Sequence, residues 1–225
     1  MERSMLDLFQ TYTPLVHHDE NDPFPLRAVG CTRFETPGTS LTVPGLSWDP
    51  QAQGARQILE YALYYDYDIQ HLYDLEHVWV AVGEDGTVVD CWSSFHGMVL
   101  RPWGLPRFFR LQGTHPVVYS EPGKHALMPD PSLFGLHPEY PACCDGLAGG
   151  GLLIPPMLKG RMHTDTAQDA AIRRYIREHF RFIPKEHYTA APWPEELFLE
   201  APELLDRIPT LVAAQLEKIR QEFPW

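Results

Sequence analysis

The chain of 225 residues has no long hydrophobic run and no apolar leader. Its most apolar stretch, residues 147–158, is too short to span a membrane and contains Pro155 and Pro156. Charged residues are mixed with apolar ones across residues 1–16, so the continuous apolar core of a signal peptide is missing. We therefore expect no transmembrane segment and a cytoplasmic protein. Export by a route that needs no signal peptide is the alternative.

Positive charge is also scarce. Lysine and arginine together number 18 against 30 aspartates and glutamates, which gives a formal net charge of −12. Such a surface repels phosphate backbones, so we expect no nucleic-acid partner. It also disfavours simple adsorption to anionic membranes. An acidic surface is compatible with cation binding, although acidic surfaces most often serve only solubility.

Cysteine is limited to four residues, whose spacing matches no zinc motif. Cys143 and Cys144 are adjacent, which makes them an awkward disulfide pair, and neither has a base at motif spacing. Reduced, inert thiols are the expectation. A bridge between Cys31 and Cys91 is the alternative for an exported protein.

The abundant residue is proline, at 22 positions, which argues for many short elements and against long helices. Residues 1–54 predict a short amphipathic segment followed by loops. Val78, Val80 and Val82 then alternate toward a Glu-Asp-Gly turn at 84–86, and the chain returns, which is a hairpin pattern. The predicted strands are 58–66, 76–82, 87–95, 107–111 and 116–120.

The C-terminal part changes to a helical period. Thr166 and Asp169 resemble a capping box, and apolar residues from Ile172 to Phe180 share one face of a helix that ends by Pro184. A second helix is predicted to begin near Pro209. We expect a single domain, residues 1–225. Its mainly β core, at about 8–160, would be a two-sheet antiparallel β-sandwich, and a C-terminal α-helical extension would cover about 164–225.

The segment around His71, Asp74 and Glu76 carries the most chemistry. Asp74 and Glu76 are two residues apart, so on a strand both side chains project from one face, and His71 can reach that face from the preceding loop. Neighbouring carboxylates repel each other and lose solvation when buried, and a cation relieves both costs. Oxygen ligands favour Ca²⁺ or Mg²⁺, whereas the histidine also admits Mn²⁺ or Zn²⁺. The alternative is that these side chains are solvated loop charges beside an isolated pair of residues at a strand end, with no metal ion.

Other polar segments carry weaker signals. A second metal cluster over residues 17–22 is less expected than a solvated loop before Pro23. Gly123-Lys124 lacks the spacing of a phosphate loop, and Ser93-Ser94 lacks the pattern of a nucleophile elbow.

The order of several short motifs matches a known family. An aromatic strand ends at Asp68, an H-x-x-D-x-E-x-V segment runs over residues 71–78, and His96-Gly97 follows. An H-P-x-V-Y segment at 115–119 then leads to Gly-x-His at 123–125. In these respects residues 8–130 resemble the necrosis- and ethylene-inducing peptide-like proteins and the related superfamily that contains vacuolar-sorting-associated proteins.

The resemblance implies a β-sandwich that holds a divalent ion in a negatively charged surface cavity. It makes Asp68 and Asp74 the leading carboxylate ligands. Other residues would complete the shell directly or through water: His71, Glu76 and His125. The expected rim residues are Asp66, His77 and His96, and Asp66 also replaces a ligand if the strand register is shifted by two.

The chain departs from the family at three positions of the motif, where Gln70, Tyr73 and Leu75 stand in place of glycine, histidine and tryptophan. The family's toxins are secreted, whereas we expect no signal peptide in this chain. The resemblance therefore supports the metal site better than it supports toxin activity. Our first hypothesis is a metal-dependent binding protein for a small polar ligand such as a lipid head group or glycan. The second is a metal-dependent hydrolase with His71, Glu76 or His77 as acid or base. The third is a structural ion in an interaction module.

Overall fold

A meander of three long strands forms the centre of the protein: β5 (Gln57–Tyr67), β6 (His71–Val82) and β7 (Val88–Phe95). The β6–β7 turn contains Gly86 at φ +79°, a backbone conformation that glycine adopts without strain. The predicted hairpin is therefore confirmed. The computed structural model describes residues 1–138, 140–141 and 149–225, and Cys143 and Cys144 lie outside this range.

The meander belongs to a seven-stranded sheet of order β14-β2-β5-β6-β7-β8, with β12 beside β6. Its remaining strands are β2 (Leu26–Phe34), β8 (Met98–Leu100), β12 (Gly151–Leu152) and β14 (Phe198–Glu200). The sequence predicts loop where β2 lies, because the apolar residues of this strand do not alternate cleanly with polar ones.

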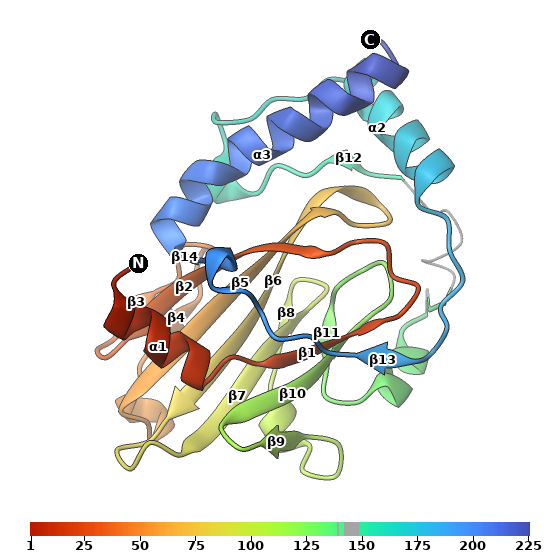
Figure 1. Ribbon diagram of the computed structural model, residues 1–225. Helices are drawn as coiled ribbons and strands as arrows, with labels where there is room; N and C mark the ends of the chain where they lie inside the picture. The colour runs from red at the N-terminus through yellow and green to blue at the C-terminus, as the bar shows by residue number, and fades with distance from the viewer. Residues whose placement is uncertain (139, 142–148) are drawn as a thin grey trace.

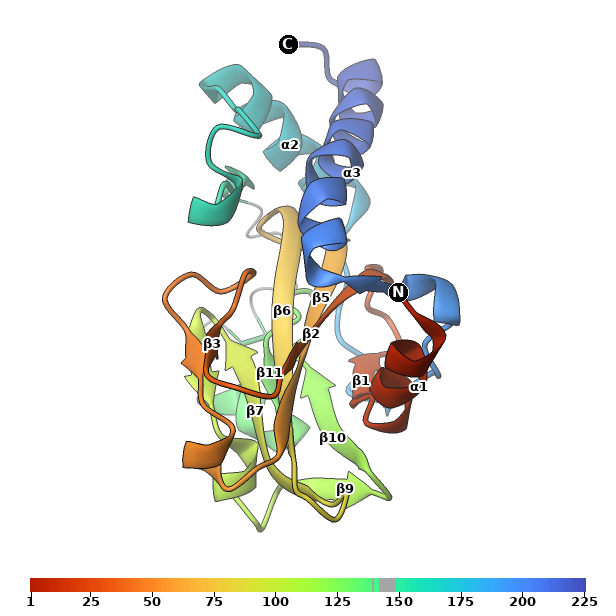
Figure 2. The same cartoon turned by 90° about the vertical axis from the view of Figure 1, so that its left-hand side faces the viewer.

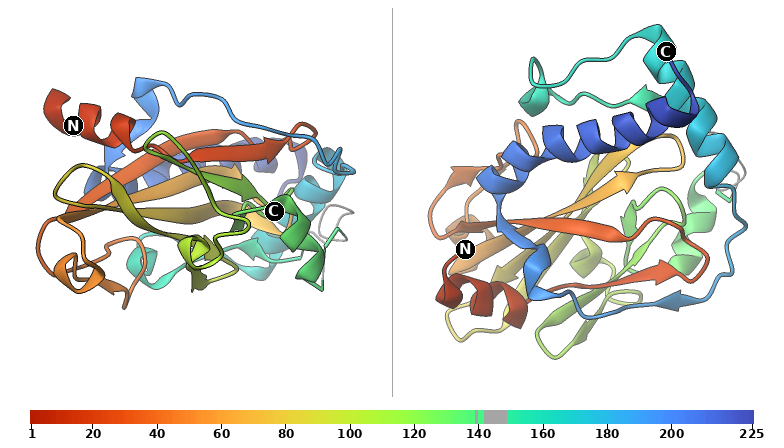
Figure 3. Two further views of the ribbon diagram at one scale, coloured as in Figure 1. Left: turned by 90° about the horizontal axis from the view of Figure 1, so that it is seen from below. Right: turned by 45° about the horizontal axis from the view of Figure 1, so that its top comes forward.

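The second sheet has five strands in the order β11-β10-β1-β13, with β9 beside β10. These strands are β1 (Leu15–Asp19), β9 (Arg110–Gln112), β10 (His115–Ser120), β11 (Leu127–Met128) and β13 (Tyr188–Thr189). The two sheets pack against each other (Figures 1 and 3), which confirms the mainly β, two-sheet fold. Most pairings are antiparallel, whereas β1–β10, β2–β14 and β6–β12 are parallel.

The remaining elements are short. They comprise α1 (Arg3–Thr11), β3 (Gly38–Thr39), β4 (Ser47–Trp48) and the 3₁₀ turns η1 (Gln51–Gln53), η2 (Pro102–Gly104), η3 (Pro131–Leu136), η5 (Pro156–Leu158) and η6 (Glu195–Leu197). The β3–β4 hairpin borders one side of the seven-stranded sheet (Figure 2).

Two helices gather at one end of the sandwich (Figure 2). α2 (Thr166–His179) begins as expected, but its N-cap is Asp165, whose carboxylate accepts the Gln168 N–H at 2.9 Å. The predicted Thr166–Asp169 capping box is thus wrong. Asp169 instead accepts the Leu152 N–H at 3.0 Å and fastens β12 to α2.

α3 (Ala201–Glu222) corrects two further predictions, because it is a long helix and Pro209 lies inside it instead of starting it. Pro209 has no N–H to donate to the preceding turn, and burial of Ile208 and Val212 on either side offsets that loss. The helix packs closely on β2 because Gly30 has no side chain. A Cβ there would lie only 2.7 Å from Leu204 Cδ2.

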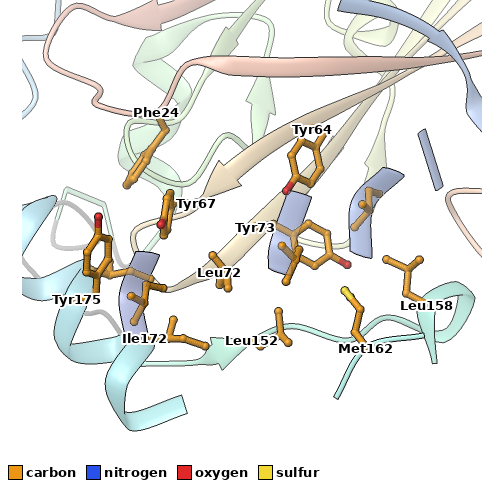
Figure 4. Packing of buried hydrophobic residues seen from close by; sticks show 14 of the residues in the cluster. Phe24, Tyr64, Tyr67, Leu72, Tyr73, Leu152, Leu158, Met162, Ile172 and Tyr175 are labelled. Atoms are coloured by element: carbon orange, nitrogen blue, oxygen red, sulfur yellow. The ribbon is translucent and has the colours of Figure 1, made fainter. Parts of the chain in front are cut away.

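The C-terminal portion is woven into both sheets through β13 and β14, so it is more than a helical extension. Figure 4 shows Tyr64, Leu72, Tyr73 and Leu152 in the hydrophobic cluster between the sheet and this helical layer. Within the part of the chain that the structure describes, no helix is both long and apolar enough to cross a membrane. Cys31 and Cys91 are buried free thiols and form no disulfide bridge.

Candidate metal centre

Tyr73 sets the geometry at the start of β6. Its φ of +46° is unusual for a residue with a side chain. Leu72 and Tyr73 both enter the cluster of Figure 4, which successive residues of a regular strand do not do. From here β6 alternates regularly, and Val78 and Val80 lie between the two sheets. Asp74 and Glu76 continue that inner face, as the spacing predicted.

A turn of residues 121–126 joins β10 to β11 and closes over this polar end of the inner face. The Glu121 N–H donates to the Ala126 carbonyl at 2.8 Å, and the His125 N–H donates to the Glu121 carbonyl at 2.9 Å. Gly123 supplies a positive φ of +74°. The Gly123 N–H donates to Asp22 Oδ2 at 2.8 Å, so a loop after β1 anchors the turn.

The turn brings His125 to Asp74. His125 Nδ1 donates to Asp74 Oδ2 at 3.1 Å, and the imidazole stacks on the Tyr65 ring with centroids 3.8 Å apart and planes 1° from parallel. His125 also has a left-handed backbone, at φ +57°, and strained residues of this kind concentrate at functional sites. Ligand atoms of Asp68, Asp74 and His125 all lie within 4.8 Å of one another. We call these three residues the β6 cluster.

Two further predicted ligands face the β6 cluster. His71 donates its Nδ1 proton to the Tyr73 carbonyl at 2.8 Å, which leaves Nε2 unprotonated in the neutral ring and 4.0 Å from Asp68 Oδ2. Backbone bonding of one ring nitrogen is the usual way in which proteins orient a metal-binding imidazole. Glu76 is buried and accepts a hydrogen bond from the Ser94 hydroxyl.

Lys124 is an internal cation that the sequence does not predict at this site. Its ammonium lies 2.9 Å from Asp68 Oδ2 and donates to Gln70 Oε1 at 2.8 Å. The side chain is nearly as buried as that of Asp68. An ion that uses both Asp68 oxygens must therefore displace this ammonium, whereas an ion held by Asp74 and His125 need not.

The pKa values follow from burial and from neighbouring charge. Burial raises the pKa of Glu76 well above its usual value, and the charge of Asp74 adds to the rise. Burial acts in the same direction on Asp74, but the hydrogen bond and charge of His125 outweigh it and lower the pKa of Asp74. The centre thus contains one carboxylate kept ionised and one biased toward its neutral form.

His125 Nε2 is a buried nitrogen without a hydrogen-bond partner among the described residues. It lies 3.9 Å from Asp22 Oδ1, which is beyond hydrogen-bonding distance. An ion on Nδ1 would require the ring proton to sit on Nε2, facing the Asp22 carboxylate. This carboxylate–histidine arrangement is common behind metal ligands, so the donor set fits a divalent ion.

A pocket of about 190 Å³ opens beside the centre, with Asp74, Glu76 and Ser94 in its wall. The rest of the wall is largely apolar: Val43, Pro44, Leu75, Met98, Val99, Leu153, Pro155 and Met157. A larger pocket of about 510 Å³ lies near α1 and Trp193 and contains none of the predicted ligands.

The three predicted rim residues lie in three different places. Asp66 pairs with Arg27 at 3.0 Å in a different pocket, under α3. His77 lines the pocket wall, where its Nε2 lies 2.9 Å from the Thr42 hydroxyl, and burial lowers its pKa to about 3. His96 lies in another group, with Glu121 and His137.

Residues 17–22 do not converge on one point. His18 Nε2 lies 2.9 Å from the Tyr65 hydroxyl, Asp19 accepts backbone N–H groups of Lys185 and Glu186, and Glu20 pairs with Lys185. Asp22 turns toward the β6 cluster, and His18 adjoins it through Tyr65, the ring on which His125 stacks. Comparison with protein-family models, with curated proteins and with solved structures gave no match. The necrosis-inducing-like resemblance therefore stays a prediction.

Proposed function

We propose that this protein binds a divalent metal ion at the β6 cluster, Ca²⁺ or Mg²⁺ before Mn²⁺ or Zn²⁺, and uses it to hold a small polar ligand. The observation that carries the proposal is the convergence of Asp68, Asp74 and His125 within 4.8 Å, fully inside the sandwich end. Burial of carboxylates is costly unless cations compensate them, and the three buried carboxylates of Asp22, Asp68 and Asp74 face only two cationic side chains, Lys124 and His125.

The pocket supports a ligand with two parts. Asp74 and Glu76 lie at its polar wall, where a head group would meet the ion, while Met98 and Leu153 at its apolar side are exposed to solvent. Exposed apolar side chains gathered around a pocket favour an apolar group on the ligand. A lipid head group with part of its chain fits this pocket better than a purely polar glycan does.

Glu76 favours a second candidate, a metal-dependent hydrolase. It combines a raised pKa with a place in the pocket wall beside the ion-binding groups. A carboxyl so placed could move a proton to or from a water that a bound ion makes acidic. The Glu76→Gln variant distinguishes the two functions when hydrolysis of chromogenic esters is measured in the variant and in the wild type. A hydrolase loses turnover while its metal affinity stays measurable, whereas a binding protein shows no turnover to lose.

The test of metal binding is metal content by elemental analysis of the purified wild type, with melting temperatures in EDTA and after addition of each ion. We expect about one ion per chain and a higher melting temperature with the bound ion. In Asp74→Asn the metal affinity should fall at least about 100-fold. Removal of a direct ligand weakens binding more than the 10–100-fold loss seen when a group that only positions a ligand is removed.

Asp66→Asn is the matched control, since Asp66 is a partly buried carboxylate on the neighbouring strand β5 and faces Arg27. It should retain the wild-type metal affinity. A metal-free wild type whose melting temperature is unmoved by Ca²⁺, Mg²⁺, Mn²⁺ and Zn²⁺ would refute the proposal.

A further inference from the structure

A second group of metal-ligand side chains lies on the other side of the 121–126 turn. His96 is the first residue of the two-residue loop between β7 and β8, Glu121 opens the turn, and His137 follows η3. His96 Nε2 lies 2.7 Å from Glu121 Oε2, and His137 Nδ1 lies 3.2 Å from Glu121 Oε1. We call these three residues the histidine cluster.

The two imidazoles are held in place by packing. Their rings stack with centroids 4.2 Å apart, and the Phe95 ring meets both edge-on, at 89° to His96 and 88° to His137. His96 has a positive φ of +49° and precedes Gly97 at +76°, which is the pattern of a type I′ hairpin turn. That position favours asparagine, aspartate or glycine, and histidine is also enriched in the left-handed region, so the turn accepts His96 and would accept asparagine in its place.

Burial distinguishes the three side chains. The Glu121 carboxylate is fully buried, whereas the His96 and His137 side chains remain 24% and 18% exposed. The carboxylate thus lies behind two imidazoles that reach solvent. An ion placed between them would contact all three and keep one side open to water.

We propose that His96 Nε2, His137 Nδ1 and Glu121 form a second metal centre, selective for Zn²⁺ and related borderline ions. Two imidazoles and one carboxylate are a frequent protein ligand set for zinc with an open fourth position. Tetrahedral bonds of about 2.0–2.1 Å separate ligand atoms by roughly 3.3 Å. The 2.7 Å and 3.2 Å nitrogen–oxygen separations are close to that value, and all three ligand atoms lie within 4.8 Å of one another.

Preference for zinc separates this centre from the β6 cluster. The β6 cluster offers mainly carboxylate oxygens, which suit hard ions, whereas nitrogen dominates in the histidine cluster. The inference does not depend on the function proposed above, since it uses no residue of the β6 cluster.

The experiment is a zinc titration of the 225-residue chain, stripped with a chelator and then kept in excess Ca²⁺, against a chromogenic zinc indicator. We expect about one zinc per chain. His96→Asn and His137→Gln should each weaken zinc binding at least about 100-fold, because each removes a direct ligand. Asparagine suits the left-handed position, so the turn is preserved. His163→Asn, at an exposed histidine elsewhere, should keep wild-type affinity.

Co²⁺ substitution gives a second readout, because histidine ligation in a low-symmetry site produces visible absorption that both cluster variants should lose. Melting temperatures in EDTA check that each variant is folded. The proposal is overturned if wild type binds no zinc, or if both cluster variants bind it as tightly as wild type. It is also overturned if Asp74→Asn abolishes zinc binding while His96→Asn does not, since the zinc then lies in the β6 cluster.

Discussion

The two faces of the seven-stranded sheet bury carboxylates in different ways. On the outer face, Glu60 is fully buried and accepts hydrogen bonds from Trp79 Nε1 at 2.7 Å, Thr32 Oγ1 at 3.1 Å and Thr42 Oγ1 at 3.3 Å. All three donors are neutral. On the inner face, Asp74 lies close to Asp68 of the β5–β6 turn, and Lys124 and His125 compensate the two carboxylates.

This difference separates a structural carboxylate from a candidate ligand. Glu60 has its hydrogen bonds supplied by fixed neutral groups, so a cation has little to add there. The inner carboxylates rely on charged partners that an ion can replace, and they adjoin a pocket and two residues with left-handed backbones, Tyr73 and His125. Burial of an acidic residue alone therefore does not indicate a metal site.

The largest effect within this comparison is expected for Lys124→Met. Removing one member of a buried ion pair leaves Asp68 uncompensated, which should destabilise the protein in EDTA by about 3–5 kcal/mol in urea denaturation. Added Ca²⁺ or Mg²⁺ should then raise the melting temperature more than in wild type, because the ion no longer competes with an ammonium. An equal or smaller rise would exclude Asp68 as a ligand.

Asp22→Asn should have an intermediate effect. Asp22 faces His125 Nε2, so its charge stabilises the ring proton that metal binding at Nδ1 requires. We expect metal affinity to fall about 10-fold, equivalent to about 1.4 kcal/mol, in competition with a metal indicator. Unchanged affinity would show that the ion does not engage Nδ1. Stability in EDTA, measured in parallel, reports separately on the lost anchor of the turn.

The smallest effect is expected on the outer face and concerns pH. Burial raises the pKa of Glu60 above its ordinary value of 4.5. A carboxyl with a raised folded-state pKa stabilises the fold below the unfolded value and loses that contribution as pH rises through the folded value. In EDTA, the wild type should therefore lose more unfolding free energy than Glu60→Gln between pH 4.5 and neutrality. Parallel pH profiles in urea denaturation would contradict this.

Local patterns explain which parts of the protein were predictable. Alternation along β6 and the glycine turn at Gly86 predicted the central hairpin and placed Asp74 and Glu76 on one face. His125 was reached only through the family resemblance, since nothing in its own neighbourhood indicates where the turn folds. The sequence does not place Lys124, Glu121 or His137 at a metal site, and it offers Asp22 only in a separate cluster over residues 17–22, because tertiary packing alone brings these residues together.

Prolines and backbone strain were harder to interpret. Pro209 predicts a helix start because the first helical position tolerates proline, but in the structure the tertiary packing of α3 overrides this preference. The left-handed conformation of Tyr73 carries no sequence signal, since tyrosine is not a turn residue. It follows from the hydrophobic cluster on one side of β6 and the polar centre on the other.

The turn of residues 121–126 has a consequence for how two ions would behave together. It carries Glu121 of the histidine cluster and His125 of the β6 cluster, only four residues apart and joined by the hydrogen bond from the His125 N–H to the Glu121 carbonyl. A cation that repositions one end of so short a segment also changes the geometry presented to the other. Occupancy of the two centres would then be thermodynamically linked. If the first ion changes the affinity for the second by a given factor, the second must change the affinity for the first by the same factor.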